Sequence, residues 1–193
     1  MADACDQEPN LQAAQTKKGG LPGQPRDKTK PGRVMATPNA DLSIVSNPAA
    51  EPAGTNGYSG AAILTLKAAG KNPQLANSTQ SVIDQIQAAC KAKGGPISVT
   101  LVGHGASGAV QIGNTRITTS PRPNTTDITP AQFQAAIDKI AAGPNAGKQC
   151  VKVIDFYSCN VITDTLGLTQ GTDFMKAMQV STLSGRGAWM RDS

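Results

Sequence analysis

From about residue 58 onward, the hydrophobic positions of the chain follow two alternating patterns. Short apolar runs that are typical of buried strands occur at residues 61–69, 97–102 and 150–157. Apolar residues at helical spacing occur at residues 78–95 and 129–143, and a third helix is expected near 171–178. Strands that alternate with helices in this way predict an α/β fold, in which helices cover a mostly parallel sheet.

Two of these helices have clear start and stop signals. For the first, Ser78 is a suitable N-cap, and Gly94 follows the last turn as a stop. For the second, Thr129 is the expected N-cap, Pro130 occupies the first turn, and Gln132 completes a capping box. These local signals predict where both helices begin.

The first 55 residues contain seven prolines and five glycines but few large apolar side chains. Such a segment cannot bury enough apolar surface to offset the entropy that is lost on ordering. We therefore expect a flexible, basic N-terminal arm over residues 1–55 and an α/β domain over residues 56–193. Within the arm, the sequence "DLSIVS" at residues 41–46 predicts one short strand.

Charge and composition narrow the class of partner. The net charge is +5, and aromatic residues make up only 3% of the chain. Nucleic-acid-binding proteins usually interleave basic residues with stacking aromatics, so no nucleic-acid partner is expected. No apolar run reaches the ~18 residues that a membrane span needs. Because the N-terminus also lacks the basic and apolar regions of a signal peptide, we expect a protein that is cytoplasmic or exported without a cleavable signal peptide.

The chain has four cysteines and one histidine. The cysteines, none of which forms a C-x-x-C pair, are Cys5, Cys90, Cys150 and Cys159. This pattern lacks the clustered ligands of a zinc site, so neither a metal nor a cofactor is expected. The spacing also does not resemble a disulfide framework, so reduced thiols are expected. Cys90 falls on the apolar stripe of a helix and Cys150 opens a strand, which favours structural roles for both.

The stretch "VTLVGHGASGAVQIGN" at residues 99–114 contains a G-x-G-x-x-G pattern, formed by Gly103, Gly105 and Gly108. A dinucleotide-binding loop of this type needs a helix immediately after the glycines, because the helix N-terminus holds the pyrophosphate. Here the following residues alternate between apolar and polar around Gly113 and Asn114, which is a hairpin signal. The sequence therefore argues against a dinucleotide site.

The same stretch resembles the nucleophile elbow of serine hydrolases, with Ser107 as its serine. That motif also needs a helix after the turn, and its histidine lies late in the chain. The single histidine, His104, lies instead three residues before Ser107. What remains is His104 itself, either as a loop histidine with a structural hydrogen bond or as one half of a catalytic pair.

Cys159 is the candidate for the other half of that pair. A nearby imidazole both accepts the proton of a thiol and stabilises the thiolate, which is the reactive form. His104 ends the predicted strand at 97–102, and Cys159 ends the one at 150–157. If the two strands are parallel, both side chains lie at the carboxyl edge of the sheet, where open α/β sheets form their crevice.

These residues carry a resemblance to a known family. The pieces "GHGASGAVQIGNTRI" and "FYSCNV", each at the end of an apolar strand, are similar to the His-Gly and Cys motifs of clan CD cysteine peptidases. The resemblance runs from about Ile97 to Met178. It is strongest to a bacterial branch, which includes caspase-like domains of large secreted adhesin-like proteins and self-processing domains of toxins. It implies a caspase-like three-layer sandwich with helices on both faces of the sheet.

The resemblance also implies an activity and a set of site residues. His104 would be the general base and acid, Cys159 the nucleophile, and the backbone N–H groups of Gly105 and Cys159 would line the oxyanion hole. The chain would be a cysteine endopeptidase that acts on a protein or peptide, as a bacterial effector or a self-processing module. The caspase signature Q-A-C-x-G is absent, so aspartate specificity is not implied. The alternative is a catalytically inactive caspase-like domain for binding or assembly, in which the N-terminal arm contacts a partner protein.

Overall fold

The computed structural model describes residues 40–53, 57–94, 96–140, 149–158, 161, 169–179 and 187–191. Most of the expected N-terminal arm lies outside the described residues. Two of the four cysteines, Cys5 and the candidate nucleophile Cys159, also lie outside them.

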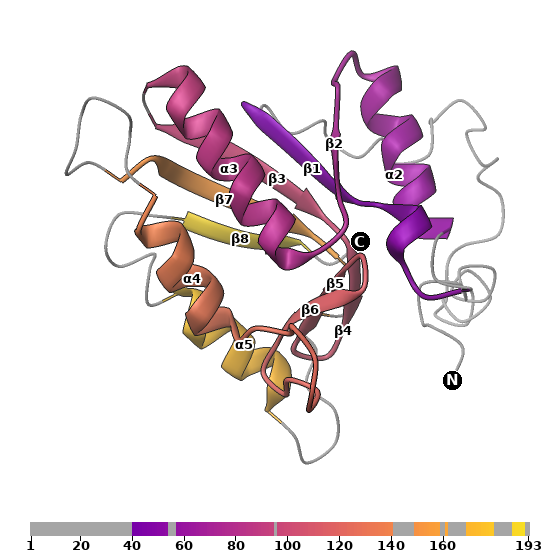
Figure 1. Cartoon of the computed structure of the whole chain (residues 1–193), viewed down its shortest axis with the longest axis vertical. Coiled ribbons are helices and arrows are strands. Elements are labelled where there is room, and N and C mark those ends of the chain that lie inside the picture. The colour runs from indigo at the N-terminus through magenta and orange to yellow at the C-terminus, as the bar shows by residue number, and fades with distance from the viewer. Residues whose placement is uncertain are drawn as a thin grey trace, which may run out of the picture. The chain divides into compact units, whose positions relative to one another are not determined.

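The main sheet has five parallel strands, and their order is β2-β1-β3-β7-β8 (Figure 1). The strands are β1 (Leu42–Ser46), β2 (Gln74–Ala76), β3 (Ile97–Val102), β7 (Val151–Tyr157) and β8 (Gly187–Arg191). The parallel sheet confirms the predicted α/β class. It also confirms the short strand expected at residues 41–46. This strand pairs with β2 and β3, so the sheet includes residues before position 56.

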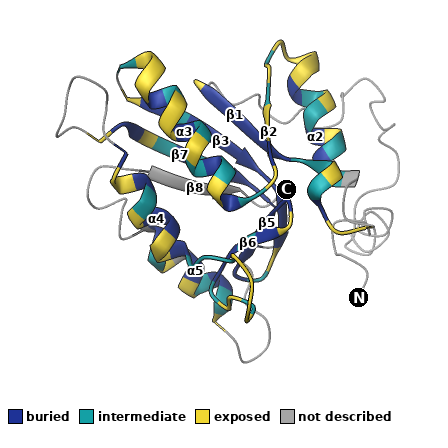
Figure 2. Cartoon of the chain, viewed as in Figure 1, coloured by how far each residue is buried: buried dark blue, intermediate teal, exposed yellow. Residues whose placement is uncertain are grey.

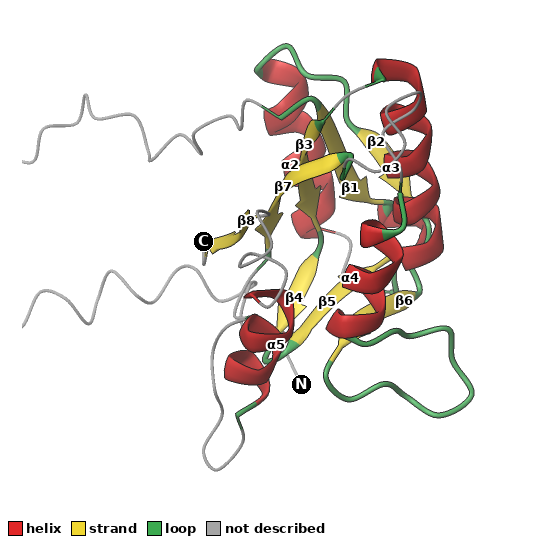
Figure 3. Ribbon diagram, turned by 90° about the vertical axis from the view of Figure 1, so that its left-hand side faces the viewer, coloured by secondary structure: helices red, strands yellow, loops and turns green. Residues whose placement is uncertain are grey.

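The described helices connect these strands. They are the short η3 (Pro48–Ala50) and the α-helices α2 (Gly57–Ala68), α3 (Thr79–Lys93), α4 (Pro130–Asp138) and α5 (Gln170–Gln179). In Figure 3 the sheet stands between α2 on one side and α3 and α4 on the other. Right-handed crossovers require this, because the chain moves from β1 to β2 in one direction and from β2 to β3 in the other. The arrangement is compatible with a three-layer sandwich.

The predicted helix starts are confirmed. The side chain of Ser78 accepts a hydrogen bond from the backbone N–H of Ser81, and Gly94 ends α3 in the left-handed region with φ 66°. Thr129 and Gln132 form the capping box of α4, each side chain accepting from the backbone of the other residue. Each start signal involves residues only three apart, which explains why the sequence alone sufficed.

The prediction of a strand at residues 61–69 is wrong, because these residues lie in α2 and the turn after it. Within this apolar run, the buried positions repeat with the period of a helix. The buried positions Ser59, Ala62 and Leu66 follow one face of a helix, whereas Leu64 is 70% exposed. A short apolar run does not distinguish a strand from a helix by its period. The topology does, since parallel β1 and β2 need a crossover connection between them.

A second, antiparallel sheet follows β3. It consists of β4 (His104–Ala106), β5 (Ala109–Ile112) and β6 (Thr115–Thr118). The hairpin expected at Gly113 and Asn114 joins β5 to β6, and Gly113 has φ 55°. No helix follows the glycines of the G-x-G-x-x-G pattern in this described part of the chain. The structure thus lacks the helix that a dinucleotide loop and a serine elbow both require.

The main hydrophobic core lies between the sheet and helices α3, α4 and α5, where Figure 2 shows the inward faces buried. Three phenylalanines from three elements meet there in edge-to-face contacts. Phe156 of β7 lies 6.2 Å from Phe133 of α4 and 6.3 Å from Phe174 of α5, between ring centroids. Each such pair adds ~0.5–1.5 kcal/mol beyond the area that it buries. This cluster fixes β7, whose carboxyl end leads to Ser158 and Cys159.

One buried carboxylate, that of Asp127, holds the segment between β6 and α4. It accepts hydrogen bonds from the backbone N–H groups of Arg116 at 2.9 Å and Arg122 at 3.2 Å. The guanidinium of Arg122 adds contacts of 2.7 and 2.9 Å. These bonds, above all those from the Arg122 side chain, hold the pKa of Asp127 well below its ordinary value.

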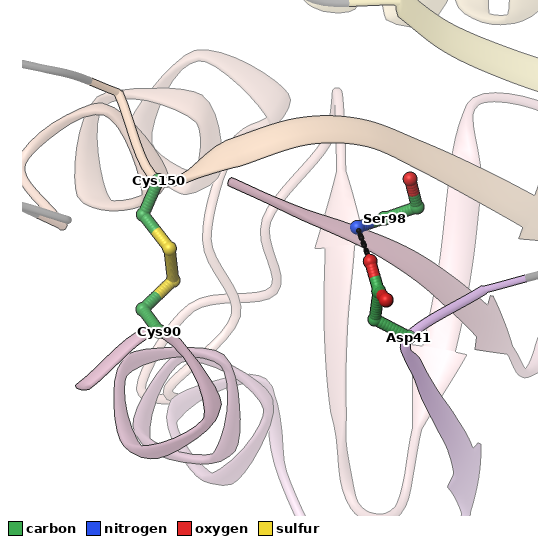
Figure 4. Close-up of a disulfide and its surroundings, with 4 residues drawn as sticks. All are labelled: Asp41, Cys90, Ser98 and Cys150. Carbon is green, nitrogen blue, oxygen red and sulfur yellow. Dashed lines mark hydrogen bonds between the residues drawn. A yellow bond between two sulfur atoms is a disulfide. The ribbon is translucent and has the colours of Figure 1, made fainter. Parts of the chain in front are cut away.

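The expectation of reduced thiols is wrong for two of the cysteines. Cys90 in the last turn of α3 and Cys150 just before β7 form a disulfide, with their Cα atoms 5.9 Å apart (Figure 4). The two residues are 60 positions apart in the sequence, so no local spacing indicates that they meet. Both are fully buried, which agrees with the structural roles expected for them.

Two further features concern the described residues only. Their histidine, cysteine and acidic side chains form no group of three or more with the geometry of a metal site. Their helices include none that is both long and apolar enough to cross a bilayer.

Candidate active site

The strand order of the main sheet reverses between β1 and β3. From β1 the chain passes to β2 on one side, and from β2 it passes to β3 on the other. In open α/β sheets, ligands bind where the strand order reverses in this way. Glu51 follows β1 and η3, and His104 follows β3, so the chain brings one acidic and one imidazole side chain to this point.

His104 leaves the main sheet through Gly103. The backbone N–H of Gly103 donates to the carbonyl oxygen of Tyr157 at 3.2 Å, which ties the end of β3 to the end of β7. A side chain at residue 103 would collide with the backbone of Gln111 and lie 2.8 Å from Ile112 Cδ1. A glycine is therefore needed here for β3 to continue directly into β4. His104, the first residue of β4, is only 7% exposed.

A buried carboxylate lies beside the imidazole. Glu51 Oε2 is 3.6 Å from His104 Nε2, and the two side chains are 0% and 8% exposed. The other oxygen, Oε1, accepts a hydrogen bond of 2.6 Å from the hydroxyl of Ser59 in α2. A carboxylate without water contact attracts a nearby cation strongly, since the local dielectric constant is low. Glu51 can therefore orient the imidazole and stabilise it when it is protonated.

The first turn of α2 forms one wall of this cluster. The ring of Tyr58 lies 5.5 Å from the imidazole of His104 between centroids, with a tilt of 57°. Its neighbour Ser59 holds Glu51. The helix that the apolar pattern assigned to a strand thus provides two of the side chains around the histidine.

Three residues at this edge have buried polar atoms that make no hydrogen bond to the described part of the chain. They are Glu51 at Oε2, His104 at both ring nitrogens, and Ser158 at its hydroxyl. Buried polar atoms are nearly always hydrogen-bonded in folded proteins. A group of such atoms, at the point where the strand order of an α/β sheet reverses, is a feature typical of a functional site.

In the sequence, the candidate nucleophile falls between two residues that are held by backbone hydrogen bonds, Tyr157 and Val161. Val102 and Tyr157 are register partners in the sheet, so β3 and β7 end together. Tyr157 accepts the hydrogen bond from Gly103, and the carbonyl oxygen of Val161 accepts one of 2.9 Å from the backbone N–H of Gly108. Gly103 and Gly108 stand on either side of β4, the strand that carries His104.

The structure describes some of the predicted site residues and not others. His104 and Gly105 lie together in β4, where Gly105 is buried and pairs with Val110. Cys159 lies outside the described residues. Glu51, Tyr58 and Ser59 were missed by the sequence analysis, because they fall in or just after the segment assigned to the arm. The one sequence signal for Glu51 was its position a few residues after the strand predicted at 41–46.

A comparison of the chain with protein-family models, curated proteins and solved structures found no match.

Proposed function

We propose that this chain is a cysteine endopeptidase of the caspase-like type, which cleaves a protein or peptide substrate through an acyl-enzyme. Cys159 is the nucleophile and His104 the proton carrier. The observation that supports this most is the pair of hydrogen bonds from Gly103 to Tyr157 and from Gly108 to Val161. They flank His104 on one chain segment and Cys159 on the other.

The anchors restrict how far a residue between them can lie. Cys159 is two residues from Tyr157 and two from Val161. A chain extends at most ~3.3–3.6 Å per residue, so two residues of chain span no more than roughly 7 Å. His104 is one residue from Gly103, which holds the first of these anchors. This restraint supports a thiol–imidazole pair at the carboxyl edge.

The reaction then has two stages. His104 accepts the proton of the Cys159 thiol, and the thiolate sulfur attacks the carbonyl carbon of the scissile peptide bond. The carbon–nitrogen bond breaks as His104 gives this proton to the leaving amine, and a thioester remains on Cys159. Water, deprotonated by His104, attacks the thioester, and the carbon–sulfur bond breaks to release the acid and regenerate the thiol.

Glu51 acts on this chemistry through His104. It lies on the Nε2 side of the imidazole, which leaves Nδ1 for the thiol. By fixing the ring and stabilising the imidazolium, its carboxylate favours the thiolate–imidazolium pair. The oxyanion of the tetrahedral intermediate would be stabilised by the backbone N–H groups of Gly105 and Cys159, which the family resemblance implies.

The test is peptide cleavage by the full chain in a Cys5→Ser background, which leaves Cys159 as the one thiol outside the disulfide. We expect cleavage of a mixed peptide library, or of the chain itself, detected by mass spectrometry. Cys159→Ala and His104→Ala should each lower the rate by at least ~10³-fold, since each removes a reacting group. Ser158→Ala is the matched control, because it removes the neighbouring hydroxyl but not the nucleophile.

Two outcomes would contradict this function. Activity that survives in Cys159→Ala but disappears in Ser158→Ala would identify Ser158 as the nucleophile. A complete absence of cleavage, together with a Cys159 thiol that alkylates no faster than in the unfolded chain, would leave the catalytically inactive binding domain as the better hypothesis.

A further inference from the structure

We propose that the Cys90–Cys150 disulfide is a permanent cross-link, and that the chain folds and works in an oxidising compartment outside the reducing cytosol. This inference is independent of the peptidase function, because neither cysteine belongs to the candidate active site. It selects export from the two locations that the sequence left open.

The cross-link joins the end of α3 to the residue before β7, at the amino edge of the sheet. Cys90 is in the last turn of α3, and Cys150 directly precedes β7. The carbonyl oxygen of Cys150 also accepts a hydrogen bond of 2.7 Å from the backbone N–H of Ile97, where β3 begins. The bond therefore ties a helix to two neighbouring strands, and it closes a loop that contains β3, the whole small sheet and α4.

The surrounding contacts tie the same edge together. One oxygen of Asp41, just before β1, contacts Lys93 Nζ of α3 at 2.6 Å, and the other accepts a hydrogen bond of 2.9 Å from the backbone N–H of Ser98 (Figure 4 shows the bond to Ser98). Asp41 N–H also donates to the carbonyl oxygen of Ser98 at 2.9 Å. The disulfide ties the residue before β7 directly to α3, which Asp41 already connects to β1 and β3. A cross-link among such contacts fits a structural role.

Burial makes the bond permanent once the domain has folded. Both cysteines are 0% exposed. Thiol–disulfide exchange needs direct attack of a thiolate on one of the sulfurs, so a reductant reaches them only when the domain opens. A regulatory disulfide, by contrast, is exposed or strained enough to exchange in the folded state. Cys90–Cys150 has the accessibility of a structural bond.

Formation of the bond needs an oxidant, which we assign to a disulfide-bonded oxidase of the compartment. The thiolate of one cysteine attacks the oxidase disulfide and forms a mixed disulfide. The thiolate of the other cysteine then displaces the oxidase. The chain loses two protons and two electrons, and the oxidase disulfide becomes a dithiol. Because the cysteines are buried in the folded chain, this exchange has to precede the final burial of the end of α3.

The test uses the full chain, produced either with export to an oxidising compartment or in a reducing cytosol. Under non-reducing conditions, peptide mapping of the exported chain should give a linked peptide pair that contains Cys90 and Cys150, and iodoacetamide should modify neither. With increasing dithiothreitol, the rate of reduction should reach a plateau set by the opening of the domain. The reduced chain should melt about 10 °C or more below the oxidised one, as expected for the loss of a cross-link over a long loop.

The Cys90→Ala/Cys150→Ala double variant should melt as low as the reduced chain, whereas the Cys5→Ser control should melt as the parent does. If the double variant fails to fold, reduction of the wild-type chain still provides the comparison. Free Cys90 and Cys150 in the exported, folded chain would overturn the cross-link. Equal melting temperatures of the oxidised and reduced chains would overturn the need for an oxidising compartment. A reduction rate that rises linearly with dithiothreitol would show an accessible, exchangeable bond and overturn its permanence.

Discussion

The polar groups at the two edges of the main sheet differ in their hydrogen bonding. At the amino edge, the carboxylate of Asp41 is paired with Lys93 and with the backbone of Ser98, and the disulfide closes the same region. At the carboxyl edge, Glu51 and His104 are more deeply buried, yet they have polar atoms with no hydrogen bond to the described residues. The same strands, β1 and β3, run between the two edges.

We explain this difference by different roles of the two edges, stability at one and chemistry at the other. A buried polar atom without a partner costs roughly 1–3 kcal/mol. A protein tolerates this cost where the group has another task, such as the transfer of a proton. We infer that the amino edge stabilises the fold and that the carboxyl edge is built for reaction. Substitutions that are alike in chemistry should therefore have unlike effects at the two edges.

A glycine-to-alanine pair should give the largest difference in stability. Gly113 at the hairpin has φ 55°, and a Cβ there would collide with the backbone of Asn77 after β2. Gly94 at the end of α3 has φ 66° but nothing within 4 Å of the added atom. We expect Gly113→Ala to lower the free energy of unfolding by about 3 kcal/mol and Gly94→Ala by about 1 kcal/mol, measured by urea denaturation. Equal costs would mean that the hairpin does not pack closely on the main sheet.

Neutralising Glu51 should reduce activity without reducing stability. Glu51→Gln keeps the shape of the side chain and an oxygen for the Ser59 hydroxyl, but it removes a buried charge. The free energy of unfolding should stay unchanged or rise by up to about 1 kcal/mol, because an amide costs less to bury. The cleavage rate should fall by about 10–100-fold, since the imidazolium loses its counter-charge. A loss of stability above about 1 kcal/mol would instead assign Glu51 to the structural framework.

The same carboxylate-to-amide change at the amino edge, Asp41→Asn, should lower the free energy of unfolding. The hydrogen bond from Lys93, and then that from Ser98, lower the pKa of Asp41. Because the pKa is lower in the folded chain, Asp41 stabilises the fold above its unfolded pKa of ~3.9 and loses this effect as the pH falls through the folded value. Asp41→Asn should therefore cost about 0.5–1 kcal/mol at pH 7, as for other partly exposed ion pairs. Urea denaturation at pH 7 and pH 3 should show this cost at the higher pH and little of it at the lower. A cost that does not change with pH would exclude the ion pair as its source.

Local signals in the sequence were sufficient for much of the fold. The capping box of Thr129 and Gln132, the caps of α3 and the turn at Gly113 each involve residues a few positions apart. Such signals act on the backbone directly, so they are readable without knowledge of the tertiary structure. They also excluded the dinucleotide loop, because a hairpin leaves no helix N-terminus for a phosphate.

The remaining features depend on contacts between distant parts of the chain. The helix α2 has a continuous apolar run, and only its crossover position between β1 and β2 identifies it. The Cys90–Cys150 pair becomes visible only once the last turn of α3 lies beside the residue before β7. Glu51 lies in a proline-rich segment, and its distance from His104 in the sequence matches no catalytic motif. The two side chains meet because β1 and β3 are neighbours. Each of these contacts is a product of topology, which a single sequence does not show.

The most direct test of the carboxyl edge as a reactive site is the rate of alkylation of Cys159 as a function of pH. The experiment uses the folded, oxidised chain in the Cys5→Ser background, with iodoacetamide and peptide mapping. An imidazole-paired thiol forms its thiolate well below the ordinary thiol pKa of ~8.5. We predict rapid modification already at pH 6, and at least a tenfold lower rate at that pH in His104→Ala. A Cys159 that reacts only above pH 8, equally in both proteins, would contradict the account.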